Sequence, residues 1–182
     1  MKTNNRYRED PVQDLLNAVV VQAAVDYRDY CARLLKNPKD WSAKKEREAV
    51  RRFFLSEDFC CYTNVGGRYI LNKLNEELNE FAFAYTEYQK EEAELQKKAR
   101  SVARLLMQKQ RHESMASEIS EKLLPEAEKK VHELIHSLRE RQMEMPDYAK
   151  KIMKYPRFET VMYVAYQQLQ EDILNGKESL WG

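Results

Sequence analysis

The sequence contains no apolar run of the roughly 18 residues that a membrane-spanning helix needs, and it has few residues that interrupt helices. There are only four glycines and five prolines in 182 residues. The first ten residues are polar and charged, so we expect no secretory leader. A net charge of +1 argues against a protein whose whole surface imitates nucleic acid. These absences favour a soluble, helical, cytoplasmic protein without a membrane partner.

Cysteine is also scarce. The three residues are Cys31, Cys60 and Cys61, an odd number with two adjacent, and adjacent cysteines make strained disulfides. We interpret them as reduced thiols, with Cys60 and Cys61 buried as small apolar residues. Nothing in their spacing predicts a cofactor or a metal.

Helical periodicity dominates the rest of the chain. Asp10-Pro11 is a helix start, and the apolar spacing up to Asn37 predicts one helix, with enough additional valine and alanine to be buried on more than one side. Ser42 is a candidate N-cap for a second helix over 43–54. After Pro125, shorter helices are expected over 126–143, 147–154 and 157–175.

One uninterrupted helix is expected from 68 to about 111. Apolar residues recur there in alternating steps of three and four, with Glu92 as the single polar exception. The seam consists of Leu71, Leu74, Leu78, Phe81, Tyr85, Tyr88, Glu92, Leu95, Ala99, Val102 and Leu106. Such a helix would be roughly 66 Å long, so it must project or pair with other helices. The fold prediction is therefore all-α: an N-terminal helical unit (1–66), a long, coiled-coil-like central helix (67–112) and shorter C-terminal helices packing back on it (113–182). The seam could close within a monomer or in a homodimer through the long helix.

Charge is distributed in blocks. The first half of the long helix is acidic and its second half basic, and a further basic cluster lies near residues 36–52. Acidic residues predicted to bind a partner are Glu76, Glu80, Glu87 and Glu91. Basic residues predicted to bind nucleic-acid phosphates are Lys97, Arg100, Arg104, Arg111, Lys44, Lys45, Arg51 and Arg52. The alternative interpretation of each cluster is a solvated helix surface with ion pairs.

The string His132-Glu133-Leu134-Ile135-His136 matches the zinc-protease pattern H-E-x-x-H. In those enzymes the two histidines bind zinc and the glutamate acts as general base. Here no G-x-x-H follows to supply a third ligand, and Glu159 is the only attractive distant carboxylate. We prefer two helix-surface histidines and keep a zinc hydrolase as an alternative.

Two stretches, residues 18–38 and residues 52–59 followed by 67–74, resemble a group of small proteins carried by phages and other mobile elements of bacteria. Their pattern is Gln-Ala-x-x-Asp-Tyr-Arg, then Phe-Phe-x-Ser, then Gly-x-Tyr-Leu-Ile. This chain departs from it with Ile70-Leu71 in place of Leu-Ile and with Gly66 where aspartate is usual. The resemblance covers about residues 12–78.

With the chain length, this pattern resembles the phage-borne anti-CRISPR proteins that inhibit Cas9. The resemblance implies a non-enzymatic inhibitor in the cytoplasm of a bacterial host. It would bind the complex of Cas9 and guide RNA and prevent target cleavage. An additional direct contact with DNA is left open. It transfers no functional residues. A phage DNA-binding regulator using the basic region 36–73 and the zinc hydrolase remain alternatives.

Overall fold

The structure is a computed structural model that describes residues 11–111 and 113–181. Within these residues it contains helices and no strand, which confirms the all-α prediction. The helices are α1 (Pro11–Lys36), α2 (Trp41–Phe54), the short 3-10 helix η1 (Glu57–Cys61), α3 (Gly67–Arg111), α4 (Glu113–Glu118), the π-helical turn η2 (Ile119–Leu123), α5 (Leu124–Glu144), α6 (Asp147–Lys150) and α7 (Phe158–Leu174). None of these helices is long and apolar enough to cross a membrane.

The chain forms two compact units, and the boundary falls inside α3. Unit 1 contains the described residues up to Phe83 together with Pro146–Ile152. Unit 2 contains Ala84–Met145 and the described residues from Met153 onward.

The seam of α3 supplies the core of both units. Nine of its eleven positions are buried, and only Glu92 and Leu106 are partly exposed. The three-four spacing of apolar residues thus marked the buried face of the helix. Because this face is buried in a single chain, no second long helix is needed to cover it.

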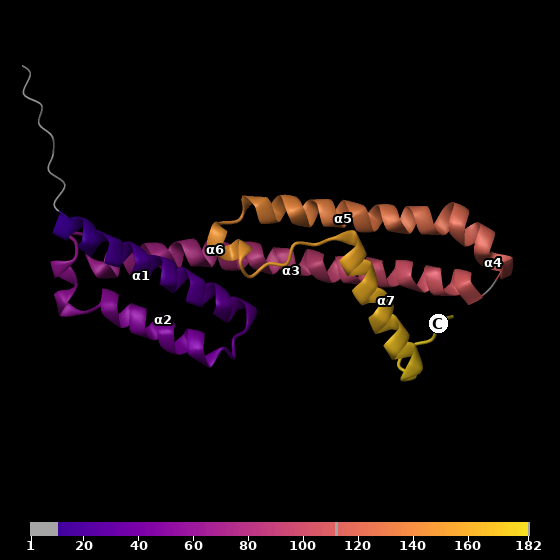
Figure 1. Ribbon diagram of the computed structural model, residues 1–182, viewed down its shortest axis with the longest axis horizontal. Helices are drawn as coiled ribbons and strands as arrows, with labels where there is room; N and C mark the ends of the chain where they lie inside the picture. The colour runs from indigo at the N-terminus through magenta and orange to yellow at the C-terminus, as the bar shows by residue number, and fades with distance from the viewer. Residues whose placement is uncertain (1–10, 112, 182) are drawn as a thin grey trace, which may run out of the picture. The chain divides into compact units, whose positions relative to one another are not determined.

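In unit 1, α1 and α2 lie side by side (Figure 1). Arg28 of α1 donates three hydrogen bonds to the Glu77 carboxylate of α3: two from Nε, one to each oxygen at 3.0 Å, and one from Nη2 at 2.8 Å. Tyr148 of α6 packs edge-to-face on Phe81, with ring centroids 5.4 Å apart. These contacts join residues that are up to 67 positions apart in sequence into one unit.

An aromatic cluster closes the end of unit 1 where α2, η1 and α3 meet. It consists of Phe53, Phe54, Phe59 and Tyr62, with ring centroids 5.2 to 6.4 Å apart. The tight 3-10 turn of η1 directs Phe59 inward and the two residues after it outward. Cys60 and Cys61 are consequently exposed, so the prediction that they are buried is wrong.

In unit 2, α5 lies along the second half of α3 (Figure 1). Its buried residues Val131, Ile135 and Leu138 follow the predicted apolar face. Tyr88 of α3 donates a hydrogen bond to the carbonyl of Lys154 at 3.1 Å. Burial, with the nearby Glu92 charge as a smaller cause, raises the pKa of Tyr88 to about 12.

Three local predictions need correction. Helix α2 begins at Trp41, because Asp40 rather than Ser42 is its N-cap and accepts a hydrogen bond from the Ala43 amide at 3.0 Å. Helix α6 ends at Lys150 instead of 154. The N-terminal half of α1 (residues 11–25) is buried on one side only, at Val20, whereas Ala32 in the C-terminal half is fully buried about a third of a turn away from that side. The predicted cap of α1 at Asp10 lies outside the described residues.

Candidate nucleic-acid interface

Four basic residues of α2 share its solvent side. Lys44 and Arg51 are two turns apart, as are Lys45 and Arg52, so each pair lies along one line of the helix. The opposite side of α2 packs against the rest of unit 1 and carries the buried residues Ala43 and Phe54. The four cations are exposed, and we name them the α2 basic surface.

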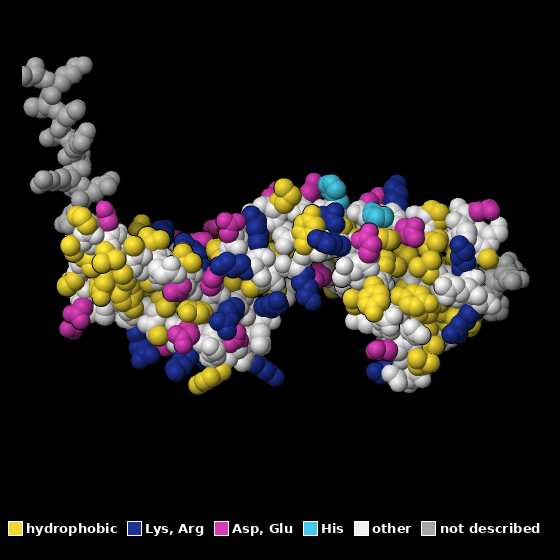
Figure 2. Space-filling view, viewed as in Figure 1, with side chains coloured by type: hydrophobic (Ala, Val, Ile, Leu, Met, Phe, Trp, Pro, Cys, Tyr) yellow, Lys and Arg dark blue, Asp and Glu magenta, His cyan; other side chains and the backbone are white. Residues whose placement is uncertain are grey.

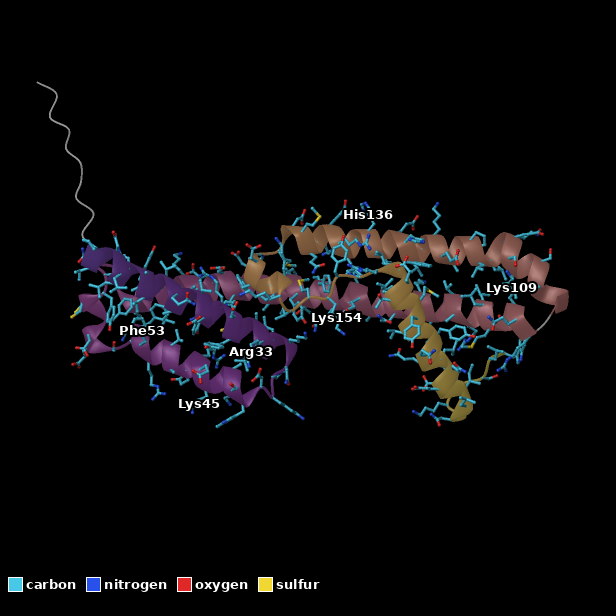
Figure 3. All side chains as sticks on the ribbon, viewed as in Figure 1. Arg33, Lys45, Phe53, Lys109, His136 and Lys154 are labelled. Carbon is cyan, nitrogen blue, oxygen red and sulfur yellow. The ribbon has the colours of Figure 1, made fainter. Side chains whose placement is uncertain are left out.

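Most of this surface is free of intramolecular charge pairing. Arg51 is bound to Glu48 at 3.0 Å. In the part of the chain that the structure describes, the side chains of Lys44, Lys45 and Arg52 make no ion pair or hydrogen bond. Figure 2 shows dark blue side chains projecting from the edge of α2, and in Figure 3 the labelled Lys45 lies on the side away from α1. Three unpaired cations on two helical turns can contact a row of phosphates.

Of the four predicted basic residues of α3, two form ion pairs within unit 2 and two are exposed. Arg100 and Arg104 are half-buried and both bind Glu178, at 2.8 and 2.6 Å. Arg100 also binds Asp172, and its hydrogen bond lowers the pKa of that carboxyl. These two arginines therefore fasten the C-terminal segment within unit 2.

Lys97 and Arg111, in contrast, are exposed. Neither makes an ion pair to another described residue. Sequence reasoning missed Asp172 and Glu178 as intramolecular partners, because they lie more than 70 positions beyond the arginines. Asp172 lies in the last turn of α7 and Glu178 lies four residues beyond the end of that helix, and nothing in their spacing indicated a contact with the arginines of α3.

The four predicted acidic residues fall in different units. In unit 1, Glu76 binds Lys73 at 2.6 Å, while Glu80 is exposed and makes no ion pair to a described residue. In unit 2, Glu87 binds Lys90 at 2.7 Å. The remaining residue, Glu91, joins α3 to α5.

Glu91 does so through two bonds. Arg141 of α5 binds its carboxylate at 2.6 Å, and the Ser137 hydroxyl donates to the same group at 3.2 Å. Only a quarter of the Glu91 side chain is exposed. Glu91 thus has a structural task inside unit 2, which leaves Glu80 as the acid of the set that is most available to a partner.

The three polar residues of the H-E-x-x-H string, His132, Glu133 and His136, are exposed on α5, as the apolar positions of Leu134 and Ile135 had indicated. The His132 ring stacks on Phe158, with centroids 4.2 Å apart and planes 8° from parallel. His136 Nδ1 is 3.3 Å from Glu140, one turn further along (His136 is labelled in Figure 3). No cluster of three or more His, Cys, Asp or Glu side chains suited to a metal occurs in the described residues.

Glu92, the one polar residue of the seam, lies at a small cavity. Glu92 lines a cavity of about 150 Å³ in unit 2, together with Tyr88, Leu95, Lys154 and Arg157. This volume is below the 300–1,000 Å³ of pockets for drug-sized ligands. The cavity explains how a carboxylate is tolerated in the apolar row: it remains partly exposed there.

Comparisons of the chain with protein-family models, with curated proteins and with solved structures found no match. The class of molecule defined by fold and surface is an all-α protein with a free basic surface on a short helix of unit 1.

Proposed function

We propose that this protein acts by binding, as an inhibitor of guide-loaded Cas9, and that the α2 basic surface contacts the nucleic acid of that complex. The observation that carries the proposal is the set of three exposed cations, Lys44, Lys45 and Arg52, without intramolecular partners. Cas9 with its guide presents a sugar-phosphate backbone that is recognised by charge and shape.

The resemblance supports the same part of the molecule. The stretches that carry it, residues 18–38 and residues 52–59 followed by 67–74, all lie in unit 1, which also carries α2. The exposed Glu80 of this unit is a second candidate contact, toward the positively charged channel of the nuclease.

The proposal predicts a salt-dependent interaction. A protein that neutralises Z phosphates of duplex DNA loses affinity with a slope of about −0.9Z in a plot of log K against log salt. Three free cations therefore predict a slope of about −3. A salt-independent affinity would remove the phosphate contact from the proposal.

The test is a cleavage assay with Cas9, guide RNA and target DNA, with this protein added over a range of concentrations. Inhibition that rises with concentration to completion supports the proposal. Unchanged cleavage at a large molar excess refutes inhibition of the Cas9 used.

A DNA-binding regulator is the second candidate function, because the same free cations fit duplex DNA without Cas9. Gel-shift titration of a labelled duplex in the absence of Cas9 separates the two. Tight duplex binding combined with undisturbed cleavage favours the regulator. Inhibition at concentrations far below those that shift free duplex favours the inhibitor.

The zinc hydrolase is a third reading of the sequence. Its test is metal analysis of protein equilibrated with zinc and then dialysed. One zinc per chain that is lost in a His132→Ala variant would support it.

A further inference from the structure

The small cavity of unit 2 lies between α3, α5, α7 and the segment that leads into α7. This segment forms one wall of the cavity, and side chains of the two long helices hold it in place. Tyr88 of α3 donates a hydrogen bond to the Lys154 carbonyl at 3.1 Å, and Arg139 Nε of α5 donates to the Pro156 carbonyl at 3.0 Å. The Arg139 guanidinium also lies over the Tyr155 ring, 4.7 Å from its centroid. The protein's own contacts therefore build this wall, as in a preformed binding site.

Glu92, which is partly exposed, is the only acid among the described residues that line the cavity. Its carboxylate makes no hydrogen bond or ion pair to another described residue. Much of the surrounding lining is aliphatic and comes from Leu95, Leu138, Val161 and Val164. A carboxylate beside such a wall loses part of its hydration, so a bound cationic group that donates hydrogen bonds to it would stabilise it.

Two exposed cations, Lys154 and Arg157, also line the cavity (Lys154 is labelled in Figure 3). In the described part of the chain, neither side chain makes an ion pair, with Glu92 or with any other acid. The lining thus presents one negative and two positive charges that are all unpaired. This arrangement is complementary to a zwitterion, because a ligand with a single charge would leave the groups of the opposite kind without a partner.

The volume of about 150 Å³ limits the size of the ligand. At the packing density of protein interiors, it holds roughly six to nine non-hydrogen atoms. Valine and leucine are of this size, and their branched side chains match the aliphatic part of the lining, whereas nucleotides and peptides are larger.

We infer that this cavity binds a small aliphatic α-amino acid. The ammonium group lies at Glu92, the carboxylate lies at Lys154 and Arg157, and the side chain packs on the aliphatic wall. This inference concerns unit 2 and is independent of the function proposed above and of the α2 basic surface.

Titration of the isotope-labelled full chain with L-valine and L-leucine, followed by two-dimensional NMR, tests the inference. The spectra report the affinity and identify the amides that respond. At least one of the two amino acids should bind saturably and shift the amides around the cavity. Isobutylamine lacks the carboxylate and isovalerate lacks the ammonium group, so each should bind at least tenfold more weakly than the amino acid.

Variants of Glu92 separate binding from folding. Glu92→Gln keeps the shape of the side chain and removes its charge, so it should weaken binding at least tenfold. Glu92→Leu should do the same without lowering the melting temperature, because it continues the apolar row between Tyr88 and Leu95. Glu87→Gln, at a carboxylate of α3 that does not line the cavity, is the matched control and should bind like the wild type.

Three results would overturn the inference. The first is the absence of any saturable shift around the cavity at millimolar concentrations of both amino acids. The second is binding of isobutylamine or isovalerate as tight as that of the amino acid, since this would assign the cavity to a singly charged ligand. The third is an affinity that both Glu92 variants leave unchanged.

Discussion

Replacing Gly67 with alanine should strongly destabilise unit 1. Gly67 is buried at the start of α3, directly against the end of α2. A Cβ atom built on it would overlap the carbonyl oxygen of Phe54 and would lie 2.8 Å from Cδ1 of Phe59. The first obstacle is backbone, which cannot rotate away as a flexible side chain can.

The magnitude follows from the kind of obstacle. Overpacking a core by a methylene group costs typically 1–3 kcal/mol, and displacement of the α2 backbone places this substitution at the upper end, about 3 kcal/mol. For a domain of 60–100 residues, each kcal/mol lowers the melting temperature by roughly 4–8 °C. Thermal unfolding followed by circular dichroism should therefore show a fall of roughly 12–24 °C in the transition of unit 1.

The adjacent glycine provides the control. A Cβ on Gly66 would meet no heavy atom within 4 Å, and the backbone of neither glycine has a positive φ. Gly66→Ala should therefore be neutral, or stabilising by about 0.4–1 kcal/mol through the unfolded chain. Equal melting temperatures for the two variants would refute the close packing of α2 against the start of α3.

The remaining predictions concern ionic and capping contacts. Glu91→Ala removes the carboxylate that joins α3 to α5, so it should lower the free energy of unfolding, measured by urea titration, by about 1 kcal/mol. Glu87→Ala is the control: its ion pair with Lys90 is more exposed, so the free energy of unfolding should change little. Equal losses would contradict the assignment of Glu91. Asp40→Ala should lower the melting temperature because it removes the side-chain cap of α2, and Ser42→Ala should not; the reverse order would restore the cap predicted from the sequence. Asp172 has a pKa below its unfolded value, so its stabilisation is present above about pH 3.9 and is lost as the pH falls toward the folded value. The melting temperature of Asp172→Asn should accordingly be lower at neutral pH and fall less between pH 5 and pH 2; parallel curves for variant and wild type would contradict this.

Periodicity carried most of the fold information in this sequence. The position of α3 and the identity of its buried face followed from steps of three and four, because a helix repeats every 3.6 residues. The same argument placed His132 and His136 at the surface of α5, since Leu134 and Ile135 occupy its apolar side. Burial that results from contacts between residues far apart in the sequence was harder to predict. The valines in the N-terminal half of α1 predicted burial on more than one side, but in the described chain Val20 is the one residue of this half that is buried.

The basic residues predicted to bind phosphates show most clearly that long-range contacts cannot be predicted from the sequence pattern. Lys45 and Arg104 look alike in the sequence, since each stands in a basic block on a helix. The difference comes from Glu178, which folds back to bind Arg104 and has no counterpart beside Lys45. Pairing over such a separation depends on tertiary structure and leaves no periodic signal. The structure therefore narrows the predicted phosphate-binding residues to those that other parts of the chain leave free.

The inhibitory dose measured with charge-reversed α2 is the most direct test of the proposed function. The amount of protein that halves target cleavage by guide-loaded Cas9 should rise at least tenfold for the double variant Lys45→Glu, Arg52→Glu. Lys122→Glu, a charge reversal at another exposed lysine, should leave the dose unchanged. If the double variant inhibits cleavage at the same dose as the wild type, or if the wild type does not inhibit, the proposal that the α2 basic surface acts on this complex is contradicted.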